Sequence, residues 1–197
     1  KKAKEELLFG FVDYAANKIS TIQNRFPLLN GTTVTISIKE QRFDTTDIDL
    51  KGRILPSTFA ATTASDHASI MATMMAGGGN TWYNTKGAAW GSNVSPASFL
   101  NLLPEPNSYY QSSSILIQNH SYGTEVENYY GPEAAGYDAS VITNNSLTHI
   151  FSAGNSGTAT PNTGNYTGIA GYSNLTGNFK QAKNVITVGH IDSFGII

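Results

Sequence analysis

The fold class is decided by the stretch Thr33-Val34-Thr35-Ile36-Ser37-Ile38-Lys39-Glu40. Residues 33–38 are β-branched and alternating after the turn Asn30-Gly31, so they predict a strand with Glu40 just past its end. Short apolar runs at residues 115–117, 149–151 and 185–188 predict three further strands. Because these runs are apolar on both faces, they indicate strands of a covered parallel sheet.

Helical patterns precede and separate these strands. Residues 67–77 predict a helix with Ile70, Met71, Met74 and Met75 toward the core, and a second stripe of alanines at 68, 72 and 76 that allows a close approach to a sheet. Residues 132–143 predict another helix, with weaker periodicity. Residues 3–25 carry the apolar spacing of an amphipathic helix, which Pro27 ends. Together these patterns predict an α/β fold: a parallel sheet with helices on both faces and right-handed crossovers.

The length and composition limit the possible functions. A chain of 197 residues predicts one domain, here residues 31–197, which the amphipathic helix within residues 1–30 leads into. A formal net charge of -2 gives no basic footprint, which argues against a nucleic-acid partner. No apolar run approaches 18 residues, so no membrane partner is implied. The lack of cysteine excludes disulfides, thiolate metal sites and a cysteine nucleophile.

Several common motifs are missing. Gly77-Gly78-Gly79-Asn80 lacks the Lys-Ser/Thr of a phosphate-binding loop and follows a predicted helix instead of preceding one. The four histidines are far apart in sequence and have no metal-ligand spacing, so no metal ligands are assigned. No Gly-x-Ser-x-Gly nucleophile elbow occurs.

Polar groups do occur at predicted strand ends and at a helix start. Glu40 follows the first strand, His67 opens a helix after Ser65-Asp66, and Asn155 lies in a Gly-flanked loop after the strand at 149–151. Each alone has an ordinary structural explanation, such as a solvated strand end, a packed histidine or a turn. Together at one sheet edge, they are the orienting acid, general base and oxyanion donor of acyl transfer.

Blocks along residues 31–192 resemble, in order, the motifs of the subtilisin-like (S8) family of serine peptidases. Residues 31–40 and Asp49-Leu50-Lys51-Gly52-Arg53 are similar to the family's G-x-x-V-x-I-A-V-I-D and D-L-x-G-R. Residues 67–77 resemble H-G-T-H-V-A with its trailing A-G, and residues 87–91 resemble G-V-A-P-G. Residues 120–123 resemble the N-x-S-x-G strand, 151–157 the A-A-G-N-x-G segment, and 184–189 the N-V-I-x-V-G strand.

The resemblance implies a three-layer subtilisin-like fold and a specific division of roles. Glu40 aligns with the acid of the triad, His67 with its base and Asn155 with the oxyanion donor. An extended polypeptide substrate would pair with two backbone segments that also form the pocket for its side chain, namely Ser121, Tyr122 and Gly123, and Ser152, Ala153 and Gly154.

The sequence departs from the family at the nucleophile. The family's serine lies in G-T-S-x-A after the N-V-I-x-V-G strand, and no such motif follows here. Ser156 is rejected as the nucleophile because Pro161 and Gly164 follow it, where a helix is required. We therefore expect the chain to be the N-terminal two-thirds of a catalytic domain, incomplete at its C-terminus, with the serine on a second segment or chain.

A second departure is Glu40 where the family has Asp. The extra methylene moves the carboxylate by about 1.5 Å unless the backbone retreats. Asp44 and Asp49 are nearby alternatives, less well placed at the strand end. The His67 helix also has Ala68 and Ile70 where the family usually has Gly and a second His.

Three functions follow as hypotheses. The first is a subtilisin-like serine endopeptidase, secreted or at the cell surface of a bacterium, as the family and the Asn-, Thr-, Tyr- and Gly-rich loops suggest. The second is a catalytically inactive subtilisin-like module that binds peptides or has a structural role. The third is an unrelated doubly wound α/β domain that binds a small ligand at its strand ends. Calcium is common in the family, but the sequence nominates no ligands for it and no other cofactor.

Overall fold

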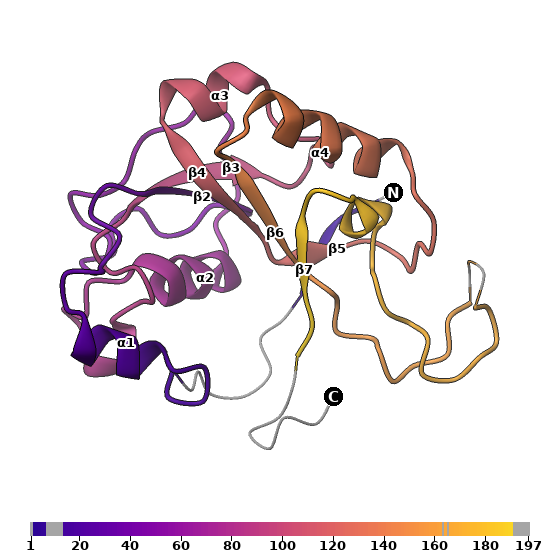
Figure 1. The fold of residues 1–197 in the computed structure, drawn as a ribbon, viewed down its shortest axis with the longest axis horizontal. Coiled ribbons are helices and arrows are strands. Elements are labelled where there is room, and N and C mark those ends of the chain that lie inside the picture. Colours follow the sequence, from indigo (N-terminus) through magenta and orange to yellow (C-terminus); the bar gives the residue numbers. More distant parts are fainter. Residues whose placement is uncertain (1, 7–13, 163, 165, 191–197) are drawn as a thin grey trace.

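A five-stranded parallel sheet forms the centre of the computed structural model, which describes residues 2–6, 14–162, 164 and 166–190 (Figure 1). The strands lie in the order β3-β2-β4-β6-β7, and each neighbouring pair is parallel. Their bounds are β2 Thr35–Glu40, β3 Asn93–Ser98, β4 Ile115–His120, β6 Thr148–Ser152 and β7 Ile186–Val188. The carboxyl ends of β2, β4 and β6 therefore meet at one edge of the sheet.

Helices cover both faces of this sheet, as the sequence predicts. Helices α1 (Ile19–Arg25) and α2 (Asp66–Ala76) lie on one side, and α3 (Asn107–Ser112) and α4 (Pro132–Thr143) on the other (Figure 1). The remaining elements are two 3₁₀ turns, η1 (Tyr83–Thr85) and η2 (Asn178–Gln181), and a small antiparallel pair formed by β1 (Lys4–Glu5) and β5 (Tyr122–Gly123). Among the described residues, no helix has the length and apolar character needed to cross a membrane.

Helix α2 packs closely on the sheet through its alanine stripe. Its N-cap Ser65 accepts a hydrogen bond from the Ala68 N–H at 3.0 Å, which satisfies one free donor of the first turn. The fully buried alanines lie against β2 and β3 in one core cluster, as the spacing predicts: Ala68, Ala72 and Ala76. The expectation that Ile70 also faces the core is wrong, because it is 44% exposed while the smaller alanines occupy the inner face.

The other face of β2 is polar and buried. Ser37 Oγ lies 2.9 Å from Tyr109 Oη, and Lys39 Nζ lies 2.7 Å from Glu105 Oε1. Gln118 on β4 donates to both Ser37 Oγ and Glu105. Because buried polar groups must be paired, this network fixes α3 and the loop before it against the sheet.

The expected helix over residues 3–25 is largely wrong. Lys4 and Glu5 form strand β1, and helix α1 covers only Ile19–Arg25 and buries none of its residues. Residues 7–13, which carry part of the expected apolar spacing, lie outside the described residues. Pairing of β1 with β5 is a tertiary contact that overrides the local helical pattern.

The strands also differ in detail from the prediction. Strand β2 ends at Glu40 itself, two residues later than expected. Strand β3 escaped prediction because Pro96 interrupts it. Among the named strands β3 is the outermost and pairs with β2, and on its other side only an isolated bridge between Val94 and Ile54 is formed, so proline is tolerated there.

Candidate active site

Glu40 is the last residue of β2 and is fully buried. One carboxylate oxygen accepts a hydrogen bond from the Ser121 N–H at 3.0 Å. The other, Oε2, lies 3.5 Å from Nδ1 of His67, an ion pair that falls outside hydrogen-bond geometry. Burial raises the pKa of Glu40 to about 7, although the neighbouring His67 opposes this rise.

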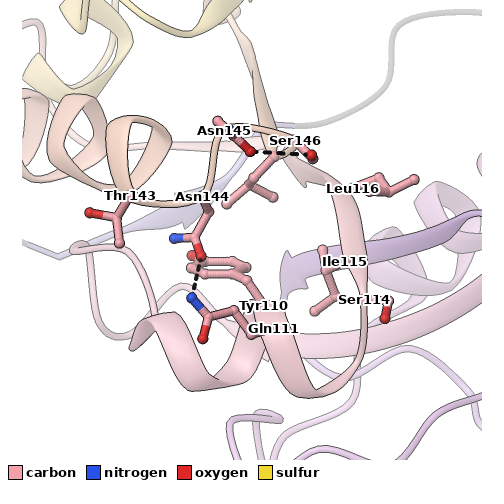
Figure 2. A pocket seen from close by; sticks show the side chains of 10 residues that line it. Tyr110, Gln111, Ser114, Ile115, Leu116, Thr143, Asn144, Asn145 and Ser146 are labelled. Atoms are coloured by element: carbon pink, nitrogen blue, oxygen red, sulfur yellow. Dashed lines mark hydrogen bonds between the residues drawn. The ribbon is translucent and has the colours of Figure 1, made fainter.

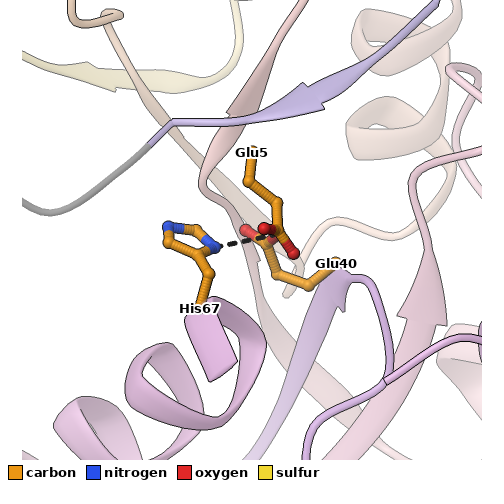
Figure 3. A group of neighbouring side chains, drawn as sticks. All are labelled: Glu5, Glu40 and His67. Carbon is orange, nitrogen blue, oxygen red and sulfur yellow. Dashed lines mark ion pairs between the residues drawn. The ribbon is translucent and has the colours of Figure 1, made fainter. Parts of the chain in front are cut away.

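His67 lies in the first turn of α2, which points its ring toward the carboxyl edge of the sheet (Figure 3). Burial lowers its pKa, but Glu40, Glu5 and the backbone of Glu6 outweigh that effect, so the net pKa is raised above 6.5. Nε2 lies 2.9 Å from the carbonyl oxygen of Glu6. Because a carbonyl only accepts hydrogen bonds, Nε2 carries a proton here. With Nδ1 facing a carboxylate, the arrangement favours the doubly protonated imidazolium.

Strand β1 lies beside His67, along the backbone of residues 121–123, which we call the groove. Lys4 pairs with Gly123 and Glu5 with Tyr122 in antiparallel register, and the Glu6 N–H donates to the Ser121 carbonyl at 3.1 Å. The Glu5 carboxylate accepts a hydrogen bond from Ser65 Oγ and lies beside Glu40 and His67 (Figure 3). The backbone of residues 121–123 is thus paired with an extended strand, as the family resemblance implies for a substrate.

The second expected wall, residues 152–154, starts at the last residue of β6. Ser152 Oγ donates to the Glu6 carboxylate, and Ala153 is held by backbone bonds to Val188 and Leu175 at 2.8 and 3.0 Å. Gly154 adopts a positive φ of 117°, which turns the chain at this point. Asn155 follows it on the same loop and is exposed.

The alternative acids, Asp44 and Asp49, are used elsewhere. The Asp44 carboxylate accepts bonds from Thr46 at 2.7 and 2.8 Å. Asp49 is buried and accepts from the backbone N–H groups of Asn80 and Thr81. The structure therefore brings Glu40, and neither aspartate, to His67.

Two site features were missed from the sequence. The first is the N-terminal segment with Glu5 and Glu6, because its helical spacing concealed a strand. The second is Lys180 in η2, whose Nζ lies 2.8 Å from Oε1 of Glu6. A single lysine in a polar loop gives no pattern by which it could be recognised.

One cluster among the described residues could offer ligands to a metal. Glu5, Glu40 and His67 each present a ligand atom, all within 4.8 Å of one another. The Glu40–His67 ion pair and the hydrogen bond from Ser65 to Glu5 already account for this arrangement. We therefore assign no metal to it.

A hollow of about 340 Å³ lies at the opposite, amino-terminal edge of the sheet (Figure 2). It is lined by uncharged residues of α3, of the start of β4 and of the α4–β6 connection, among them Tyr110, Asn144 and Ser146. Gln111 donates to the Asn144 side chain at 3.2 Å across it. With no carboxylate, imidazole or amine among its lining residues, it offers no counterpart to the chemistry at the other edge.

Comparison with known proteins decides the family. The model of the subtilase family, Peptidase S8, matches residues 31–195. The chain belongs to the subtilase family. This membership excludes the hypothesis of an unrelated small-ligand domain. Comparison with curated proteins found no match.

Solved structures share the fold of this subtilase chain. The prenylagaramide maturation protease PagA superposes with a TM-score of 0.63 at 12% identity, covering 90% of this chain and 60% of PagA. The MycP3 protease from the type VII (ESX-3) secretion system gives 0.60 at 12% identity, covering 98% and 63%. The protease domain of PatA gives 0.59 at 15% identity, covering 87% and 62%. The chain thus spans less than two thirds of the length of each of these chains.

Proposed function

We propose that this chain carries the acid and base of a subtilisin-like serine endopeptidase that hydrolyses peptide bonds in polypeptides. One arrangement carries the proposal: Glu40 is paired with His67, whose Nε2 lies at the carbonyl of Glu6, directly after strand β1. That strand is paired on residues 121–123, so its carbonyl stands where a scissile carbonyl would be presented.

In this mechanism His67 is the general base. With β1 displaced and Nε2 unprotonated, Nε2 takes the proton from a serine hydroxyl as the serine oxygen bonds to the substrate carbonyl carbon. The C–N bond then breaks, and Nε2 returns the proton to the leaving amine. Water hydrolyses the resulting ester by the same steps. Glu40 is a positioning residue, which orients the ring through Nδ1 and stabilises the imidazolium.

The negative charge that develops on the carbonyl oxygen needs donors. Asn155 is proposed as the side-chain donor, because it aligns with the family's A-A-G-N-x-G segment and follows the loop wall that lies beside Glu6. A donor aimed at the developing oxyanion acts only in the transition state.

The serine is proposed to come from polypeptide outside these 197 residues. This chain covers 60% of PagA and 63% of the MycP3 protease, so the proposed serine would lie in a part of the domain that the chain does not span. Within the described residues, Ser156 is followed by turns and later by the 3₁₀ turn η2, and by no α-helix. Ile186 and Val188 on the outermost strand β7 are each 51% exposed, an apolar edge that a further segment would cover.

We also propose a biological setting for the protein. The loop composition and the family favour a secreted or cell-surface bacterial protein acting on polypeptides. The weak negative charge favours neither nucleic acid nor membrane as a partner. No calcium ligands are assigned.

A second candidate is a catalytically inactive module that binds extended peptides. It is favoured by the 3.5 Å separation of Glu40 and His67 and by the glutamate in place of aspartate. Such a module would use the groove of residues 121–123 without performing chemistry.

Covalent labelling separates the two candidates. The complete protein, with every polypeptide that co-purifies, is treated with a fluorophosphonate and measured by intact mass. The peptidase predicts one adduct on a serine, lost in His67→Ala. The inactive module predicts no adduct in either protein.

A further inference from the structure

The side chain of Glu6 enters a closed polar pocket behind the groove. Both carboxylate oxygens lie within hydrogen-bond distance of Lys180 Nζ, at 2.8 and 2.9 Å. Ser152 Oγ and Thr176 Oγ1 donate to the same carboxylate. Lys180 also contacts Thr176 Oγ1 at 2.9 Å, so the pocket is connected within itself.

The backbone of Glu6 defines which substrate position this pocket serves. Its N–H donates to the Ser121 carbonyl, and its own carbonyl oxygen lies at Nε2 of His67. A substrate residue bound in the same way presents its carbonyl to the base. The pocket therefore receives the side chain on the acyl side of the bond to be cleaved.

Two glycines leave the space that the carboxylate fills. A Cβ at Gly123 would collide with Glu6 Oε1 and with Thr176 Oγ1. A Cβ at Gly154 would lie 2.6 Å from Thr176 Oγ1 and 3.3 Å from Glu6 Oε1. Side chains at either position would close the pocket to a carboxylate.

The charge of Lys180 makes the pocket selective. The Lys180 side chain is fully buried. Among the described residues, Lys180 forms its ion pair with Glu6. Burial lowers the pKa of Lys180 to about 8, and Glu6 opposes this. When a substrate displaces β1, only an incoming carboxylate restores the pairing. A neutral or basic side chain leaves a buried ammonium uncompensated.

We propose that this pocket selects a glutamate side chain, with Lys180 as the specificity-determining residue, so that the protein cleaves peptide bonds on the carboxyl side of glutamate. The inference rests on the proposed peptidase function. Aspartate, one methylene shorter, reaches Lys180 less well, and glutamine has the shape of glutamate without its charge.

The activity test uses the complete protein and peptides that differ only at this position. We expect kcat/KM for Glu to exceed that for Gln, Leu or Lys by about 100-fold or more, because a site built for a polar group rejects analogues that leave it unpaired. Lys180→Met should lower kcat/KM for Glu to about the value for Gln, so that the preference for Glu is lost. Equal rates for Glu and Gln in a labelled wild-type protein would overturn the proposal.

A binding test works without catalysis. In Glu6→Ala the pocket is vacated, and the peptide Lys-Glu-Glu is titrated against Lys-Glu-Gln by calorimetry. At least 10-fold tighter binding of Lys-Glu-Glu, abolished by adding Lys180→Met, supports the pocket even where labelling fails. Equal affinities overturn the pocket, whatever the outcome of labelling.

Discussion

The carbonyl oxygen of Glu6 lies 2.9 Å from Nε2 of His67, where the proposed general base meets a peptide carbonyl. Because that contact requires a proton on Nε2, the segment formed by β1 and Glu6 lies against the protonated form of His67. Substrate hydrolysis needs the opposite state, a free groove and an unprotonated Nε2. Under the proposed function, strand β1 would therefore compete with peptide substrates for the groove.

Removing the side-chain anchor of β1 should open the groove. Glu6→Ala deletes the contacts to Ser152, Thr176 and Lys180, so the population with a free groove rises. We expect an increase of about 10-fold in the affinity for an added glutamate-containing peptide, measured by calorimetry. Lys4→Ala, in β1 two residues earlier, is the matched control. An equal gain in Lys4→Ala would show that the pocket contacts do not hold β1.

Replacing the acid should change both rate and pH dependence. Glu40→Gln keeps the shape but removes the charge. Loss of the orienting acid costs about 10⁴ in kcat in a well-characterised serine peptidase triad, and we expect a loss of similar size here. His67 has a raised pKa, so the base loses activity as pH falls through a value above 6.5. Without Glu40 that acidic limb should move to lower pH. An unchanged pH–rate profile would contradict a positioning role.

The conservative variant tests the geometry of the pair. In the wild-type protein the Glu40 carboxylate already lies 3.5 Å from Nδ1 of His67. Glu40→Asp shortens the side chain by about 1.5 Å and so moves the carboxylate further from Nδ1 unless the backbone shifts. We therefore expect Glu40→Asp to lower kcat, despite restoring the family residue. A higher kcat in Glu40→Asp would show that the backbone adapts to the shorter acid.

Two buried histidines should make the fold sensitive to acid. His120 Nε2 lies 3.0 Å from His149 Nδ1, and burial lowers the pKa of His120 well below 6.5 and that of His149 to about 3. Both are neutral in the folded protein, so their stabilisation is complete above pH 6.5 and is lost as pH falls below it. The free energy of unfolding should drop by about 1.4 kcal/mol per pH unit for each histidine.

Denaturant unfolding between pH 4 and 8 measures this slope. His149→Gln removes one titrating group and should flatten the dependence by about half. A variant at the surface, Asn145→Gln, is the control. Stability that is independent of pH over this range would show that the histidines are not held neutral.

The alanine stripe of α2 should not accept larger side chains. Ala72 is fully buried against β2 and β3, so Ala72→Leu should cost about 1–3 kcal/mol through overpacking. Ile70→Ala, on the exposed side of the same helix, should cost less. Equal costs would contradict the packing described for α2.

The sequence predicted the elements that carry regular periodicity. Four strands, α2 and α4 followed from apolar runs and helical spacing, and the edge position of Glu40 followed from the end of β2. Strand β1 was not predictable because its pairing with β5 is a contact over more than 110 residues, which local spacing does not encode. Lys180 was missed for the same reason. Its role depends on its ion pair with Glu6, and only the folded chain brings these two residues together.

Under the proposed function, His67 activates a serine for attack on peptide carbonyls. The most direct measurement is the intact mass of every polypeptide in the complete protein after fluorophosphonate treatment, with His67→Ala beside it. A peptidase should give a single adduct on a serine outside residues 1–197, and His67→Ala should give none. A complete protein that stays unlabelled would contradict it and favour the inactive peptide-binding module.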